Sequence, residues 1–347
     1  MQLTFLKTSR SNGCRAKLVK IMKTKIFCMM VLCVGLLVGC DKEEEYEPIK
    51  PPIEEPDEPI TTPSTDDIIK TKIGDIDMIV GSNMWNAITY GNGKYVAVGQ
   101  NGSIAYSSNG VNWTTKSMGS QFWKSVVYGN GKFVAVGGYS DGGYVATSTD
   151  GVTWTIQKNI TDAHIFDICY NGSIFVIVCH WGSSKGRDYI LKSIDGVNWT
   201  SKTTVGNGYG WSGICYGNGK FVTVGDKYGC GIAVSSNGMN WNITNSNNMD
   251  SWNSVAYGNG KYVAVGDFGY IITSKDGVNW NTPVKITSAG TSQWFHITYS
   301  NGKFVAVGGG GGYITSIDGE TWTPIANLKD ESGKVITAIL NGACAMP

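Results

Sequence analysis

The stretch Trp252–Trp280, WNSVAYGNGKYVAVGDFGYIITSKDGVNW, occurs six times along the chain with small changes. In this copy, Trp252–Tyr257 alternates as a half-buried strand does. The pair Asn259-Gly260 that follows is typical of a two-residue hairpin turn, because both central residues of such a turn take positive φ. The uninterrupted apolar run Tyr262–Val265 then indicates a second strand, buried on both faces.

The second half of the stretch repeats this strand and turn pattern. Tyr270–Ser274 is predicted to be a third strand, Asp276-Gly277 a second tight turn, and Trp280 the start of a fourth strand. The aromatic residues that open the six copies are Trp85, Trp123, Phe166, Trp211, Trp252 and Trp294. Their average spacing of about 42 residues is in the range of β-propeller blades, each of which is a four-stranded antiparallel sheet.

A short motif, Ser-x-Asp/Asn-Gly-x-x-Trp, lies at the predicted turn between the third and fourth strands. Its six occurrences are Ser107–Trp113, Ser148–Trp154, Ser193–Trp199, Ser235–Trp241, Ser274–Trp280 and Ser316–Trp322. The motif resembles the Asp-box of sialidase-like (BNR-type) β-propellers and is one residue shorter than the usual form. The resemblance covers residues 85–324. It implies an all-β propeller in which the acid and the serine hold the hairpin and the tryptophan packs between sheets, and it implies no particular activity.

The number of blades follows from the length of the repeat region. Residues 66–347 divided by the repeat length give about 6.7 blades, so we predict seven. The seventh would be composite: Val335–Gly342 would supply a first strand and its Asn-Gly turn, and Ile68–Gly74 and Ile76–Val80 the third and fourth strands. Such a blade would remove the exposed edges of the ring. A six-bladed ring with loose tails is the alternative.

Composition excludes some partners. The chain has 28 basic and 27 acidic residues, a net charge of +1, so no global field attracts nucleic acid. Nine cysteines without CxxC spacing, and three histidines at different repeat positions, give no metal signature. We therefore expect no nucleic-acid partner, no cofactor and no metal, and we expect a monomer.

The N-terminal residues predict export. Basic residues precede the apolar run Ile26–Val38, which has the length of a secretory signal and is too short to span a bilayer. The run ends in Leu37-Val38-Gly39-Cys40, which resembles a bacterial lipobox. This resemblance implies cleavage before Cys40 and lipidation of that residue, which would anchor the protein to a membrane. Residues 1–40 are therefore interpreted as a lipoprotein signal segment.

The next segment predicts a spacer. The acidic run Asp41–Glu45 resembles the surface-export signal of Bacteroidetes lipoproteins, with an ordinary solvated charge run as the alternative. Residues 41–65 are rich in Pro and Glu, so they cannot bury enough apolar surface to fold and act as an extended linker. We expect an outer-membrane, cell-surface lipoprotein whose propeller domain, residues 66–347, is held away from the membrane.

The turns of the repeat fall into two classes that predict a binding face. The Gly-Asn-Gly-Lys and Asp/Asn-Gly turns are uniform and share one face. The second-to-third turns and the links between blades differ among copies and share the opposite face, and variable loops on a rigid scaffold are the usual place for binding. The candidate binding residues on this variable face are Tyr139, His180, Trp181, Arg187, Asp226, Tyr228, Asp267 and Phe268.

Two residue sets on that face have competing interpretations. Asp226 and Asp267 would lie on neighbouring blades, where they could bind a polar ligand or act as acid and base. The alternative is that Asp simply suits the end of a strand. The opening aromatic residues could stack on a sugar or peptide, but periodic aromatic residues are more typical of packing between blades.

These patterns favour a binding module for a glycan or a protein partner. A glycoside hydrolase is one alternative, and an assembly or scaffold factor for a membrane complex is another, because some Asp-box-like propellers of photosynthetic organisms assist assembly. Sialidase chemistry is excluded: the sialidases that the motif resembles hold the substrate carboxylate with three Arg, and the predicted folded region has one, Arg187. We assign no catalytic residue.

Overall fold

The computed structural model describes residues 3–8, 68–73, 76–81, 85–110, 112–139, 142–161, 163–182, 189–199, 201–205, 210–225, 231–244, 251–288, 293–330, 333–335 and 339–345. All of them belong to one compact unit. Strands and tight turns make up nearly all of this part of the chain. It contains no helix that is long and apolar enough to cross a membrane.

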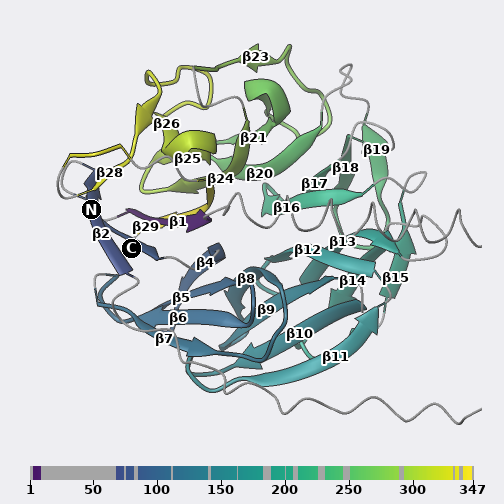
Figure 1. The fold of residues 1–347 in the computed structure, drawn as a ribbon. Helices are drawn as coiled ribbons and strands as arrows, with labels where there is room; N and C mark the ends of the chain where they lie inside the picture. Colours follow the sequence, from purple (N-terminus) through teal and green to yellow (C-terminus); the bar gives the residue numbers. More distant parts are fainter. Residues whose placement is uncertain are drawn as a thin grey trace, which may run out of the picture. The chain divides into compact units, whose positions relative to one another are not determined.

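Six four-stranded antiparallel sheets follow one another along the chain, one for each sequence repeat, and they form the blades of a β-propeller (Figure 1). Blade 1 is β4 (Trp85–Gly91), β5 (Lys94–Gly99), β6 (Ser103–Ser107) and β7 (Thr114–Ser117). Blade 2 is β8 (Trp123–Gly129), β9 (Lys132–Tyr139), β10 (Gly142–Ser148) and β11 (Thr155–Thr161). Blade 3 is β12 (Ala163–Tyr170), β13 (Phe175–Gly182), β14 (Tyr189–Ser193) and β15 (Ser201–Thr204).

The second half of the ring repeats this order. Blade 4 is β16 (Trp211–Gly217), β17 (Lys220–Gly225), β18 (Ile232–Ser235) and β19 (Asn242–Thr244). Blade 5 is β20 (Trp252–Gly258), β21 (Lys261–Gly266), β22 (Tyr270–Ser274) and β23 (Val284–Lys285). Blade 6 is β24 (Trp294–Ser300), β25 (Lys303–Gly308), β26 (Gly312–Ser316) and β27 (Ala326–Asn327). The first strand of each blade contacts the first strand of the next, so these strands surround the centre of the ring.

The prediction of seven four-stranded blades is wrong, and the alternative of six is correct. The terminal segments form strands, but these are divided between two smaller sheets at the seam between blades 6 and 1. One sheet pairs β29 (Ile339–Ala345) with β1 (Leu3–Thr8), and the other contains β28 (Lys329–Asp330), β2 (Ile68–Ile73) and β3 (Ile76–Gly81). β29 contacts both β24 and β4 and thereby closes the ring of first strands.

Two positions of the repeat differ from the sequence interpretation. Asn341-Gly342 lies within β29, where Gly342 pairs with Leu6 of β1 and Asn341 is an extra residue of the strand, so it is not a turn. In blade 3 the buried opening position is Ile165, which pairs with Cys179 as Trp123 pairs with Gly137 in blade 2. Phe166 is therefore the residue after the opening position. The sequence alignment placed the opening position of each copy at an aromatic residue. In blade 3 it therefore chose Phe166, one residue too late, because the true opening residue, Ile165, is aliphatic.

The predicted tight turns are confirmed by backbone geometry. Asn259 and Gly260 have φ of 45° and 73°, and the equivalent Asn-Gly pairs of blades 1, 2, 4 and 6 also have positive φ. At the next hairpin, the Asp276 carboxylate accepts hydrogen bonds from the N–H groups of Val278 and Asn279 at 2.8 and 2.7 Å. The fourth strand of this blade begins at Val284 rather than at Trp280, which forms an isolated bridge with Ser274.

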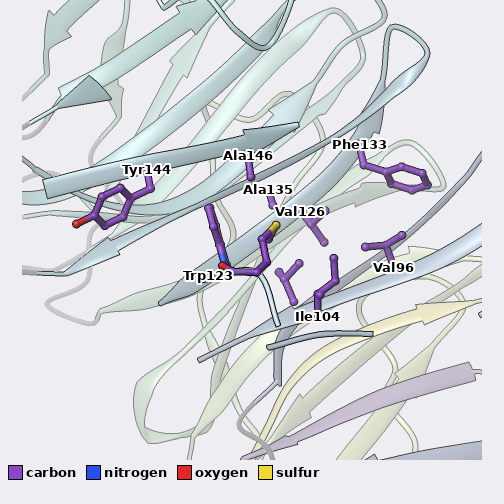
Figure 2. Packing of buried hydrophobic residues seen from close by; sticks show 10 residues of the cluster. Val96, Ile104, Trp123, Val126, Phe133, Ala135, Tyr144 and Ala146 are labelled. Atoms are coloured by element: carbon purple, nitrogen blue, oxygen red, sulfur yellow. The ribbon is translucent and has the colours of Figure 1, made fainter. Parts of the chain in front are cut away.

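The core lies between neighbouring blades. Figure 2 shows Val96 and Ile104 of blade 1 packed with Trp123, Val126 and Phe133 of blade 2. Equivalent clusters join blades 2 and 3, 3 and 4, 4 and 5, and 5 and 6, and Trp211, Trp252 and Trp294 are buried in them. Burial of such surface is the main favourable term in folding. The five opening Trp residues therefore pack, as expected for periodic positions, and do not form a stacking surface.

Four of the turns between first and second strands fix a blade to the next through a glycine and a tyrosine. A Cβ atom on Gly258, at the end of β20, would lie 2.0 Å from Cγ of Tyr299 in blade 6. The same close approach joins Gly91 to Tyr128, Gly129 to Tyr170 and Gly217 to Tyr257. Each of these glycines thus leaves the space that the ring of the following blade occupies. The first glycine of the Gly-Asn-Gly-Lys turn is required by packing, and the second by positive φ.

Polar groups of the same turns reach the next blade as well. Asn259 donates from Nδ2 to the carbonyl oxygen of Ile317 at 3.0 Å, and Asn92 donates likewise to Thr149 at 3.1 Å. Lys220 donates from Nζ to the carbonyl oxygen of Asp276 at 2.9 Å. The side chains of the uniform turns therefore bond one blade to the next. The turns have the same sequence in different blades because each makes the same contacts between blades.

The two glycines of one turn allow a matched test. We expect Gly260→Ala to cost about 1 kcal/mol, because its site is open and only the positive φ is unfavourable for alanine. We expect Gly258→Ala to cost about 3 kcal/mol, because the new methyl group would overlap Tyr299. Chemical unfolding of both variants measures the difference, and equal costs would contradict this packing.

Candidate functional site: the channel mouth

A β-bulge recurs at the same place in the first strand of every blade. In blade 5, Trp252 pairs with Gly266 and Ser254 with Val265, so Asn253 is an extra residue without a partner in the ladder. A bulge redirects a side chain that pleating would otherwise place on a sheet face. The extra residues are Asn86, Lys124, Phe166, Ser212, Asn253 and Phe295 in the blades and Asn341 in β29. We call these seven residues the bulge ring.

The bulge ring lines a cavity of about 260 Å³ at the centre of the propeller. All seven of its residues border this cavity, and a second layer is formed by Ala87, Ser125, Asp167, Ser254 and His296. The second-layer residues directly follow the bulge residues in sequence. In five of the six blades the bulge therefore turns two successive residues towards the channel, and in blade 4 only Ser212 lines it.

The cavity lies at the end of the blades that bears the variable turns. The link before β20 and the turn after β21 meet there, because Asp267 donates its N–H to the carbonyl oxygen of Ser251 at 3.0 Å. Asn253 is close to the same turn and donates to Oδ1 of Asp267 at 3.0 Å. The uniform turns lie at the opposite end of the strands. The cavity is thus on the face where the sequence predicted binding.

Asparagines of the bulge ring join neighbouring blades. Asn86 donates from Nδ2 to the carbonyl oxygen of Trp123 at 2.7 Å, and Asn253 donates to that of Trp294 at 3.0 Å. At the seam, Asn341 donates to the carbonyl oxygen of Trp85 at 3.2 Å. These bonds satisfy carbonyl groups that the bulge leaves out of the ladder. They also fix the orientation of the side chains at the mouth.

Asp167 connects three blades below the bulge ring. Its Oδ1 accepts hydrogen bonds from Oγ of Ser125 in blade 2, at 2.7 Å, and from the N–H of Ile168, at 2.8 Å. Its Oδ2 accepts from the N–H of Ile214 in blade 4, at 2.9 Å. Removal from water nevertheless outweighs these bonds and raises the pKa of Asp167 to about 6. This carboxylate is a structural crosslink with a pKa near neutrality.

The other titratable groups of the cavity are shifted towards their neutral forms. Burial lowers the pKa of His296 to about 4, so its imidazole is neutral at pH 7. Its Nδ1 lies 3.4 Å from Oγ of Ser254. Burial also lowers the pKa of Lys124, whose Nζ lies 5.3 Å from the centre of the Phe166 ring. That distance is within the range of a cation–π interaction.

Asp267, one of the predicted binding residues, has a positioning role. It begins the short 3₁₀ turn η2 (Asp267–Gly269) after β21. Its Oδ1 accepts hydrogen bonds from Nδ2 of Asn253, at 3.0 Å, and from Nε2 of Gln293, at 3.2 Å. It therefore holds a bulge residue and the link to blade 6 in place. The predicted pairing with Asp226 stays a prediction, since Asp226 lies outside the described residues.

Phe268, beside it, is the predicted residue with the features of a contact site. Its side chain is 55% exposed. Its φ of 54° and ψ of 17° place it in the left-handed region, which is unfavourable for a bulky residue. Blade 6 has a glycine, Gly310, at the equivalent position of η3 (Gly309–Gly311). The turn therefore presents an exposed aromatic ring next to Asp267, which is bonded to Asn253 of the bulge ring.

The remaining predicted residues are not placed relative to this cavity. Tyr139 lies in β9, and His180 and Trp181 lie in β13, but their side chains are outside the description. Arg187, Asp226, Tyr228 and the lipidation candidate Cys40 are outside the described residues altogether. Their roles stay predictions.

Sequence reasoning missed the bulge ring, although a signal for it existed. The opening position is nearly invariant among copies, whereas the next position changes from Asn to Lys, Phe, Ser, Asn and Phe. A position that varies among copies while its neighbours in the strand do not is one whose side chain is not held by packing between blades. That signal was hidden because Phe166 was assigned to the opening position.

Metal and thiol chemistry find no support within the described ranges. No three His, Cys, Asp or Glu side chains there are grouped closely enough to hold a metal ion. Cys169 and Cys215 are free thiols, and burial raises the pKa of each. A thiol with a raised pKa is a poor nucleophile at neutral pH.

No family model and no curated protein sequence matches the chain. Solved structures with a similar fold include the WD40 β-propeller domain of Doa1, at 12% identity and a TM-score of 0.58, covering 80% of this chain and 95% of that one. YCF48 bound to D1 peptide is similar at 15% identity and a TM-score of 0.55, covering 74% and 84%. YCF48 from Cyanidioschyzon merolae matches at 11% and 0.54, covering 77% and 90%. At such identities these similarities establish the β-propeller fold alone.

The Asp167 crosslink predicts a characteristic pH dependence. Its pKa in the folded protein, about 6, is above the 3.8 of an unperturbed carboxyl group. Its contribution to stability is therefore fully present below pH 3.8 and is lost as the pH rises through 6, by about 3 kcal/mol in all. The effect of His296 on stability has the opposite pH dependence. Its lowered pKa stabilises the folded protein above pH 6.5, and this stabilisation is lost as the pH falls through about 4.

Asp167→Asn separates these effects, because it removes one titration and leaves the other. We expect the variant to be less stable than the wild type at pH 4 by about 1–3 kcal/mol, since its amide nitrogen would face an N–H donor. The difference should shrink between pH 4 and pH 7. Parallel curves of unfolding free energy against pH for the two proteins would contradict this assignment.

Proposed function

We propose that this protein is a lipid-anchored binding module of the outer membrane that holds a protein partner on the face bearing the channel mouth. The observation that carries the proposal is the bulge ring: seven unpaired strand positions of varied chemistry that surround one cavity. The opposite face supports this choice because the side chains of its uniform turns are bonded between blades. Phe268 adds an exposed aromatic side chain on the same face, next to the Asp267 that is bonded to Asn253 of the bulge ring.

The size of the cavity favours a polypeptide over other ligands. A volume of about 260 Å³ is below that of most pockets for drug-sized molecules, roughly 300–1,000 Å³. It is suited to one or two side chains of a partner that otherwise lies across the face. YCF48 in complex with D1 peptide and the Mitotic Checkpoint Complex are structures of similar fold in which peptides or proteins assemble. An assembly or scaffold role is one form of such binding.

A glycoside hydrolase finds less support. Acid and base catalysis of glycoside cleavage uses two carboxylates across the scissile bond. Among the described residues that line the cavity, Asp167 is the single carboxylate, and both of its oxygens already accept hydrogen bonds. Membrane anchoring through Cys40 and exposure at the cell surface belong to the same proposal and rest on the N-terminal sequence.

The binding proposal is tested with the full chain on a random 12-residue peptide array and on a glycan array. We expect peptide binders whose affinity falls at least tenfold in Phe166→Ala and in Phe268→Ala, because each variant removes an aromatic contact from the mouth. The control is Val278→Ala, which truncates a side chain that is 42% exposed on the uniform face.

Two outcomes would contradict the proposal. Glycan binding that is lost in the Phe166 and Phe268 variants, with no peptide binding, would identify a glycan module. Peptide binding that is lost only in Val278→Ala would move the site to the uniform face.

A further inference from the structure

Lys124 differs from the other members of the bulge ring because it brings a charge to the mouth. Its side chain borders the cavity, and its Nζ lies over the ring of Phe166. Within the described ranges it forms no ion pair, whereas Lys261 on the uniform face is paired with Glu320 at 2.6 Å. An ammonium group that is partly removed from water without a counter-ion is unfavourable in the unbound protein.

The nearby titratable groups do not supply that counter-ion. Asp167 also borders the cavity and is ionised at pH 7, but within the described ranges it forms no ion pair with Lys124, and its two oxygens are directed at Ser125, Ile168 and Ile214. His296 is neutral at pH 7, as described above, and lies beside Ser254. A ligand that places an anion near Lys124 would therefore supply the one strong interaction that this part of the ring lacks.

Asn253 of blade 5 and Asn341 of β29, on either side of Phe295, form an arc of the ring with the complementary polarity. Nδ2 of Asn253 already donates to Trp294 and Asp267, and Nδ2 of Asn341 already donates to Trp85 and Asn86. An amide nitrogen has two hydrogens, so each of these residues retains its carbonyl oxygen as the group for a ligand. This arc therefore accepts N–H groups and disfavours anions.

We propose that Lys124 binds the carboxylate of an Asp or Glu side chain in an extended segment of the protein partner, with a backbone N–H of that segment directed towards Asn253 and Asn341. This inference rests on the proposed function and specifies its chemistry. The cation and the acceptor arc together fix the orientation of the bound residue. A carboxylate there would also raise the pKa of Lys124 again, because an opposite charge favours the ammonium form.

The test uses capped pentapeptides Gly-Gly-X-Gly-Gly, with Glu, Asp, Gln or Lys at X, and calorimetry with the full chain at pH 7. We expect the Glu or Asp peptide to bind at least tenfold more tightly than the Gln peptide. Lys124→Met should abolish this preference and Lys124→Arg should retain it. Lys275→Met is the matched control, because it removes one positive charge from the exposed uniform face.

Each other outcome has a definite meaning. If peptides from the array bind wild type and Lys124→Met equally and show no preference for acidic residues, this inference is wrong and the proposed function stands. If no peptide binds any of the proteins, both are wrong. If sodium glucuronate binds more tightly than the Glu peptide and its binding is lost in Lys124→Met, the anion belongs to an acidic sugar and the peptide assignment is overturned. A raised melting temperature of Lys124→Met would agree with the removal of an unpaired charge.

Discussion

In the first strand of each blade, a buried side chain is followed directly by an extra residue that has no partner on the neighbouring strand. Together these two features constrain the backbone of the strand. The opening side chain, such as Trp252, is enclosed between blades, and the next residue has no partner on the neighbouring strand. The bulge therefore sends the side chains of two successive residues to the channel. The bulge recurs in all six blades and in β29, and both residues line the cavity in five of the blades, so the interior of the ring is lined by a regular set of positions whose side chains are free to vary.

The rest of the repeat is fixed by contacts between blades. The glycine at the end of the first strand in four blades gives space to a tyrosine of the following blade, and the asparagine and lysine of the turns bond to the next blade's backbone. Substitution at these positions would loosen the joint, which explains their uniformity. Chemical variety is consequently confined to the bulge ring and to the turns and links at the same end of the blades. The uniform turns that join the blades therefore lie at one end of each first strand, and the positions proposed for binding lie at the other end.

Much of the fold could be predicted from local sequence rules. Asn259-Gly260 and the Ser274–Trp280 hairpin each have a conformation that few other residues support, and both were assigned correctly. The blade count failed because it depends on how distant ends pair, and Asn341-Gly342 looked like another tight turn although it lies in β29. The bulge was not predictable from periodicity, since one extra residue changes which side chains face the channel without changing the repeat length. Asp267 was predicted as a binding residue, which stays a prediction, and its bonds to Asn253 and Gln293 could not be predicted because they depend on tertiary contacts.

Site-specific photo-crosslinking is the most direct test of the claim that partners meet this protein at the bulge ring. A photoreactive phenylalanine analogue would replace Phe295 at the channel mouth in one protein and Val278 on the uniform face in another. Each protein would be irradiated with an array-selected peptide at the same concentration. The account predicts a crosslinked product from position 295 and none from position 278. A product from position 278 alone would show that the partner binds the uniform face and would contradict the assignment of the site.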